Sequence, residues 1–179
     1  GGRGTAQHFG LEGQVDLVMG TFSKSFASIG GFLAGSKEAV HWVQVFARPF
    51  IFSASLPPPN VATVLACLDV MAQEPERIER VNKIGGRVRT ELKAMGYNVG
   101  PSQTPIIPIV IGDMMDTMKA WKILFGAGIY TNVALPPAVP PNEALLRTSY
   151  MATHTDAQID RVLETFKRLK DQIHLPPSS

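Results

Sequence analysis

Lys24 lies in a short segment that combines an amine with several hydroxyl groups. The segment Thr21–Ser25 reads TFSKS and directly follows an apolar run at residues 15–19. Its hydroxyls can donate hydrogen bonds to an anion, and glycines on either side let the backbone approach a ligand closely. A nucleophilic amine beside a phosphate-binding cradle is what a Schiff-base lysine requires. The segment therefore favours covalent chemistry at Lys24.

Two other interpretations of Lys24 compete with this one. A lysine in a loop is most often a solvated surface charge. Lys24-Ser25 also matches the end of a P-loop, but that motif needs glycine where Ser23 stands and another at Val18, inside the apolar run. The P-loop interpretation fails on both counts, and the solvated-charge interpretation stays open on these residues alone.

Residues 1–74 supply the elements that must position Lys24. Apolar runs at 15–19 and 30–34 predict two strands buried on both faces. With two predicted helices, these elements are too few to bury such strands, so we expect upstream residues to complete the sheet. The start at Gly1, without methionine and within a glycine-rich stretch, also indicates a fragment.

Several residues predict where helices begin. Ser36 and Asp113 are each expected to cap a helix, and Thr155 with Gln158 forms a capping box for the last one. The triple proline at 57–59 predicts a rigid, non-helical connector, after which Asn60 caps another helix.

Residues 75–175 predict a compact α+β domain, followed by a tail at 176–179. Three helices alternate with strands expected at residues 106–111, 129–133 and 145–150. Proline cannot donate to a strand ladder, so Pro108 places the first of these strands at a sheet edge or a bulge.

The composition excludes several classes of function. The chain has 179 residues, of which 45% are hydrophobic and 18% charged, with a net charge of +2 and no basic run, which argues against a nucleic-acid partner. No apolar run is long enough for a transmembrane helix. The single cysteine, Cys67, excludes an internal disulfide, and the histidines show no metal spacing, so we expect no metal and a cytoplasmic location.

Four segments of the chain stand out. In chain order they are GRGTAQHFGLEGQVD at 2–16, GTFSKSFASIGGF at 20–32, FIFSASLPPP at 50–59 and LLRTSYMATHTDAQID at 145–160. All four, in this order, resemble segments of one enzyme family, the α-oxoamine synthases, which are fold-type I pyridoxal-phosphate (PLP) enzymes related to the class I/II aminotransferases. The resemblance implies an α/β fold in which residues 1–74 end the large PLP-binding domain, whose sheet is mostly parallel. Residues 75–175 would form the small C-terminal α+β domain.

The resemblance also implies roles for individual residues. Lys24 would bind PLP and act as the base at the amino acid's Cα, while Thr21 and, less directly, Ser23 would bind the cofactor phosphate. Ser53 and Ser55 would reach the phosphate of the other subunit in a homodimer with shared active sites. Arg147 would bind the substrate carboxylate. From the residues alone, an exposed arginine in a surface ion pair is the favoured interpretation of Arg147. For the two serines, turn hydroxyls are nearly as good an interpretation as phosphate ligands.

The family condenses an amino acid with an acyl-CoA and releases carbon dioxide. GTFSKS with GGF, MATHT after the arginine and PAVPP at 137–141 are most similar to the bacterial serine palmitoyltransferases. This similarity implies that L-serine and a long-chain acyl-CoA give a 3-keto sphingoid base. Glycine C-acetyltransferase and 8-amino-7-oxononanoate synthase activities are the enzymatic alternatives, and a catalytically silent scaffold is the non-enzymatic one. We expect the isolated fragment to be inactive.

Overall fold

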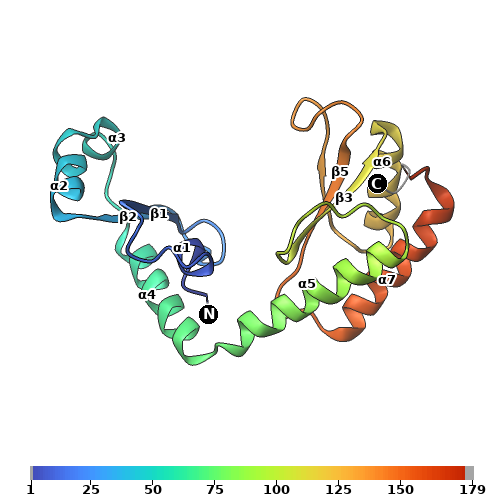
Figure 1. Ribbon diagram of the computed structural model, residues 1–179, viewed down its shortest axis with the longest axis horizontal. Coiled ribbons are helices and arrows are strands. Elements are labelled where there is room, and N and C mark those ends of the chain that lie inside the picture. Colours follow the sequence, from blue (N-terminus) through green and yellow to red (C-terminus); the bar gives the residue numbers. More distant parts are fainter. Residues whose placement is uncertain (1, 176–179) are drawn as a thin grey trace. The chain divides into compact units, whose positions relative to one another are not determined.

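The chain folds into two compact units that meet in the sequence between Pro75 and Glu76 (Figure 1). The computed structural model describes residues 2–175, so the predicted tail at 176–179 lies outside the described residues.

The first unit contains the lysine segment between two paired strands. Its elements are α1 (Thr5–His8), β1 (Leu17–Thr21), β2 (Gly31–Gly35), α2 (Lys37–Phe46), α3 (Arg48–Ile51) and α4 (Pro58–Gln73). β1 and β2 are antiparallel, with Leu17 opposite Gly35 and Thr21 opposite Gly31. The faces of both strands are left uncovered within the described residues, since Met19 is 70% exposed and Phe32 47%, as expected if further elements are needed to bury them. Two strands alone cannot cover their own faces.

The triple proline begins α4 instead of preceding it. Pro57 occupies the N-cap position, and Pro58 and Pro59 form the first helical turn. Proline is tolerated there because the first N–H groups of a helix have no partner within it. Asn60 therefore does not cap the helix as predicted. Its side-chain amide instead donates a hydrogen bond to the hydroxyl of Ser28.

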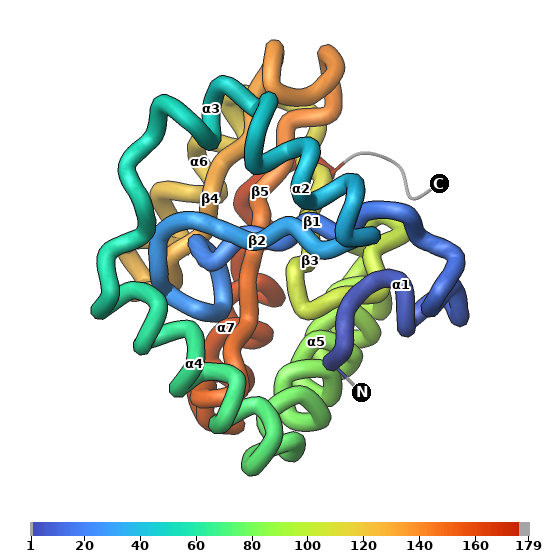
Figure 2. Tube along the Cα trace, turned by 90° about the vertical axis from the view of Figure 1, so that its left-hand side faces the viewer, coloured from blue at the N-terminus to red at the C-terminus, as the bar shows by residue number. Residues whose placement is uncertain are grey.

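The second unit is a three-stranded sheet with helices against it. Its elements are α5 (Glu76–Ala94), β3 (Ile106–Gly112), α6 (Met114–Gly126), β4 (Asn132–Ala134), β5 (Ala144–Ser149), α7 (Asp156–Leu169) and a 3-10 turn, η1 (Lys170–Gln172). All pairs are antiparallel in the order β3-β5-β4. α5 and α7 pack side by side, and α6 contacts both β3 and β5 (Figures 1 and 2). Pro108 lies on the edge strand β3, as predicted.

The helix caps predicted at Ser36, Asp113 and Thr155 are confirmed. Ser36 Oγ accepts a hydrogen bond from Ala39 N at 3.2 Å, and Asp113 Oδ1 accepts one from Asp116 N at 2.8 Å. Thr155 and Gln158 form the reciprocal capping box at the start of α7.

Phe166 of α7 lies at the centre of the second unit's core. It is 0% exposed, its ring meets that of Tyr97 edge-on at 5.5 Å, and its carbonyl accepts a hydrogen bond from the Tyr97 hydroxyl at 2.7 Å. The alternating buried residues of β3, which are Ile107, Ile109 and Ile111, belong to the same core.

Phe166→Ala is expected to lower the free energy of unfolding of this unit by about 3–5 kcal/mol, because it removes a fully buried ring and leaves a cavity. Lys167→Ala, one position along the same helix on its exposed side, should change stability by less than about 0.5 kcal/mol. Urea denaturation of both variants measures the difference. Equal effects would show that Phe166 is not a core residue.

Tyr150, just after β5, gives the second unit a dependence on alkaline pH. Burial raises the pKa of Tyr150 from 10.0 to about 12, and the Thr148 hydroxyl partly opposes the rise. The stability contributed by the neutral phenol is therefore complete below pH 10 and is lost as the pH rises through about 12. Between about pH 9 and pH 12, the wild type should lose about 2–3 kcal/mol more than Tyr150→Phe. Urea denaturation at each pH measures this loss. An equal decrease in the free energy of unfolding of both proteins would contradict the effect of burial.

Candidate active site

The Lys24 segment is a tightly hydrogen-bonded loop between β1 and β2. Phe22 N donates to Gly30 O at 2.9 Å, Ser28 N donates to Phe22 O at 3.0 Å, and Ala27 N donates to Lys24 O at 3.0 Å. These bonds close the loop at its base and again around Lys24. The Lys24 side chain is exposed, so the loop presents its amine at the surface of the first unit.

Aromatic contacts anchor the loop, and two hydroxyls that lie close to Lys24 in the sequence are hydrogen-bonded to each other. The ring of Phe22 stacks on Phe32 at 6.0 Å and meets Phe26 edge-on at 5.7 Å, which anchors the loop in apolar contacts. Ser23 Oγ donates a hydrogen bond to Thr21 Oγ1 at 3.4 Å. The structure thus brings together two hydroxyls that were predicted to bind a phosphate, within three residues of Lys24.

α4 and the segment before it support the loop from the side. Ser28 is only 6% exposed, and its hydroxyl donates to Asn60 O at 3.3 Å while accepting from Asn60 Nδ2 at 3.1 Å. Gly30 adopts a φ of 88°, and a Cβ atom there would lie 2.2 Å from Leu56 Cδ2. Cys67 of α4 is half-buried, with its Sγ 3.9 Å from Phe26 O.

Ser53 and Ser55 lie on the exposed segment between α3 and α4. Within residues 2–175, neither side chain is hydrogen-bonded to the Lys24 loop, so the structure does not bring them to the other predicted cofactor-binding residues. Their predicted role across a subunit interface stays a prediction.

Arg147 lies in the middle of β5, opposite Pro108 on β3 and Asn132 on β4. Its neighbours Leu146 and Thr148 are buried against the helices, so alternation places Arg147 on the other, exposed face of the sheet. Its Nη2 donates a long hydrogen bond to Asn132 Oδ1 at 3.5 Å. Among the residues that the structure describes, Arg147 forms no ion pair with a carboxylate, which disfavours the surface ion-pair interpretation.

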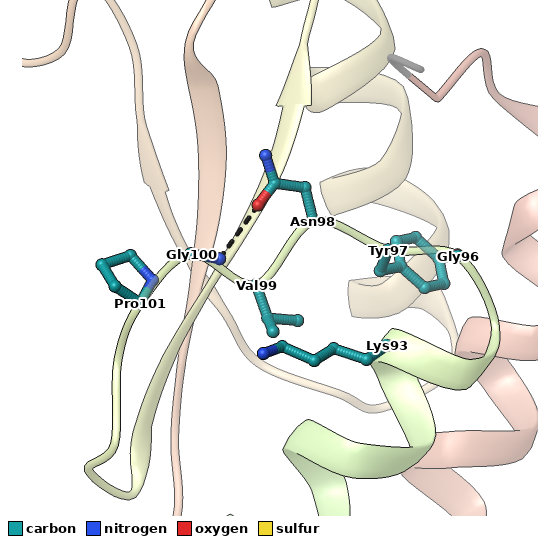
Figure 3. Close-up of a pocket in the computed structure, with 7 residues that line it drawn as sticks. All are labelled: Lys93, Gly96, Tyr97, Asn98, Val99, Gly100 and Pro101. Carbon is teal, nitrogen blue, oxygen red and sulfur yellow. Dashed lines mark hydrogen bonds between the residues drawn. The ribbon is translucent and has the colours of Figure 1, made fainter. Parts of the chain in front are cut away.

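Two hollows of the second unit contain none of the predicted site residues. One of about 620 Å³ is lined by Lys93 and the turn from Gly96 to Pro101, where Asn98 Oδ1 accepts from Gly100 N at 3.0 Å (Figure 3). The Asn98 side chain is engaged in this hydrogen bond within the turn, so we interpret the hollow as structural. No group of three potential metal ligands occurs among residues 2–175. Over the same residues, no helix combines the length and hydropathy required to cross a membrane.

The first unit thus presents an exposed lysine on a hydrogen-bonded loop close to two hydroxyls, and the second unit presents an arginine on the exposed face of a sheet. The family model for aminotransferase class I and II matches residues 1–166, and the chain belongs to that family. The predicted family is therefore confirmed.

Individual relatives agree with this family. The chain is 47% identical over 175 residues to a serine palmitoyltransferase (SPT) of Bacteriovorax stolpii, covering 98% of this chain and 42% of the relative. An 8-amino-7-oxononanoate synthase of Alkaliphilus oremlandii is 37% identical over 174 residues, covering 97% of this chain and 44% of the relative. A high-resolution structure of SPT with the PLP internal aldimine superposes with a TM-score of 0.90 at 38% identity, covering 96% of this chain and 44% of that one. The chain thus spans less than half the length of these relatives.

Sequence reasoning missed Ser28 and Asn60. Serine within a loop and asparagine after a proline run are both ordinary turn and cap residues. No local signal distinguishes them, because the two residues are 32 positions apart and meet only in the folded unit.

Proposed function

We propose that the full-length protein containing this chain is a PLP-dependent acyltransferase. It would condense L-serine with a long-chain acyl-CoA to give a 3-keto sphingoid base, coenzyme A and carbon dioxide. The observation that carries this proposal is Lys24 on its closed, hydroxyl-flanked loop, in a chain 47% identical to a serine palmitoyltransferase.

The residues of the first unit fit PLP by the chemistry of their donors. Lys24 offers an exposed primary amine for the cofactor aldehyde. The hydroxyls of Thr21 and Ser23, already within hydrogen-bonding distance of each other, can both donate to a phosphate. We assign Thr21 as the main phosphate ligand and Ser23 as its support.

In the proposed mechanism, Lys24 and Arg147 have separate roles. The bound cofactor supplies an electron sink for negative charge at the substrate Cα. Lys24 accepts the proton that leaves Cα. Arg147 binds the substrate carboxylate with the planar fork of its guanidinium, which can donate two parallel hydrogen bonds. By holding the carboxylate, Arg147 orients the bonds at Cα for the reaction, which is a positioning effect.

We also propose where this chain belongs in the whole enzyme. Residues 1–74 would form the C-terminal part of the PLP-binding large domain, and residues 75–175 the small C-terminal α+β domain. The exposed apolar side chains of β1 and β2, such as Met19 and Phe32, support this, because further strands and helices of a large domain would cover them. We further propose a cytoplasmic homodimer, in which Ser53 and Ser55 reach the partner's cofactor phosphate. Phe52, 84% exposed beside Ser53, supports an interface there.

Three other functions are alternatives to this proposal. The 8-amino-7-oxononanoate synthase relative makes that activity the second candidate, with glycine C-acetyltransferase as a third. A silent scaffold is the non-enzymatic alternative, and the presence of the lysine among hydroxyls argues against it.

Borohydride trapping of the full-length protein, supplied with PLP, tests the cofactor. We expect peptide mapping to find a pyridoxyl mass on the peptide that contains Lys24. A folded protein without this adduct would favour the scaffold.

Product analysis with serine, glycine and alanine against short and long acyl-CoAs then tests the substrates. Activity with glycine and acetyl-CoA only would reject the sphingoid-base reaction and support glycine C-acetyltransferase.

A further inference from the structure

The Lys24 loop holds a backbone conformation that its own residues do not favour. Ala27, three positions after Lys24, has a φ of 49°. In this left-handed region the Cβ of a residue other than glycine crowds the following carbonyl oxygen. The loop therefore needs contacts from outside to hold it in place.

The strongest outside contact is the pair of hydrogen bonds between Ser28 and Asn60. The hydroxyl of Ser28 both donates to Asn60 O and accepts from Asn60 Nδ2. Ser28 directly follows Ala27 and is almost fully buried, so a lost partner would leave a buried polar group unsatisfied, which is costly. Ser28 N also donates to Phe22 O across the loop. Movement of Ser28 would therefore be transmitted to Phe22, two residues before Lys24.

We propose that Ser28 and Asn60 are positioning residues for Lys24. Their reciprocal hydrogen bonds attach the loop at residues 22–30 to the first turn of α4 and thereby set where the Lys24 amine lies relative to the Thr21 hydroxyl. This proposal rests on the proposed cofactor function of Lys24. Neither residue needs to contact the cofactor, and both act through the loop.

The test compares Ser28→Ala, Asn60→Leu and the double variant in the full-length protein. Asn60→Leu keeps a similar volume while removing the side-chain amide. Thr63→Ala is the matched control, because Thr63 lies on the same helix and its hydroxyl bonds only to Pro59 O within that helix, at 2.9 Å. Two readouts are used: hydrogen–deuterium exchange of the loop amides, and the pH midpoint of the visible absorbance of the cofactor bound to Lys24.

Asn60→Leu removes one hydrogen bond and should speed exchange of the Ser28 amide and its loop neighbours about tenfold. Ser28→Ala removes both hydrogen bonds and should speed exchange at least as much. Each single variant should also shift the pH midpoint of the absorbance. The double variant should do no more than the worse single variant, because the two side chains act as one unit. Thr63→Ala should match the wild type. If one single variant fails to fold, the other still decides the question.

Wild-type exchange rates in the single variants would overturn the proposal. So would faster exchange together with an unchanged pH midpoint, because the loop would then move without affecting Lys24. A wild-type protein that forms no adduct at Lys24 would instead reject the proposed function. This outcome is distinguishable because the exchange rates are measured without reference to the cofactor.

Discussion

Lys24→Ala is expected to lower kcat of the full-length enzyme by about 10⁴-fold or more, because a positioned general base alone contributes up to about 10⁴-fold. The variant also loses the nucleophilic amine that would hold the cofactor. We expect the pyridoxyl adduct to disappear from the peptide map, while the folded structure is retained because the Lys24 side chain is exposed.

Lys37→Ala is the matched control for this experiment. Lys37 is also an exposed lysine of the first unit, at the start of α2, and should keep wild-type turnover and the adduct at Lys24. If Lys24→Ala retained more than about a tenth of the wild-type kcat, Lys24 could not be the catalytic base. The adduct on another lysine would relocate the cofactor site.

Arg147→Ala is expected to lower kcat/KM for the amino acid by about 10³-fold, because two charge-assisted hydrogen bonds to the carboxylate are lost. Arg147→Lys should lose about 10–100-fold, since an ammonium group keeps the charge but cannot form the bidentate contact. KM for the acyl-CoA should change little, because the acyl-CoA does not need this contact. Steady-state kinetics with each substrate varied in turn would measure kcat/KM for the amino acid and KM for the acyl-CoA separately.

Arg168→Ala provides the control for Arg147. Arg168 is an exposed arginine of the same unit, and its Nε forms a surface ion pair with Glu164 at 3.1 Å. Its loss should leave both kinetic constants unchanged, because such a pair contributes little. Equal kinetics of Arg147→Lys and the wild type would show that Arg147 supplies charge alone and no specific geometry.

Features that depend on neighbouring residues were predictable from the sequence. Ser36, Asp113 and Thr155 cap helices because their side-chain oxygens bond N–H groups two or three residues ahead. Pro108 marks an edge strand because it has no N–H to donate. The prolines at 57–59 were misjudged because a first helical turn and a rigid connector both accept proline, and only packing separates the two.

Local sequence patterns were sufficient to predict the family, the lysine segment with its hydroxyls, and the position of most helix starts, because each rests on residue types at short spacing. The folded structure was needed to show how the Lys24 loop is held and which face of β5 carries Arg147. The bonds between Ser28 and Asn60 join residues 32 positions apart, and the exposed face of β5 depends on its pairing with β3 and β4. Such contacts form only when distant segments pack, and no local pattern encodes their register.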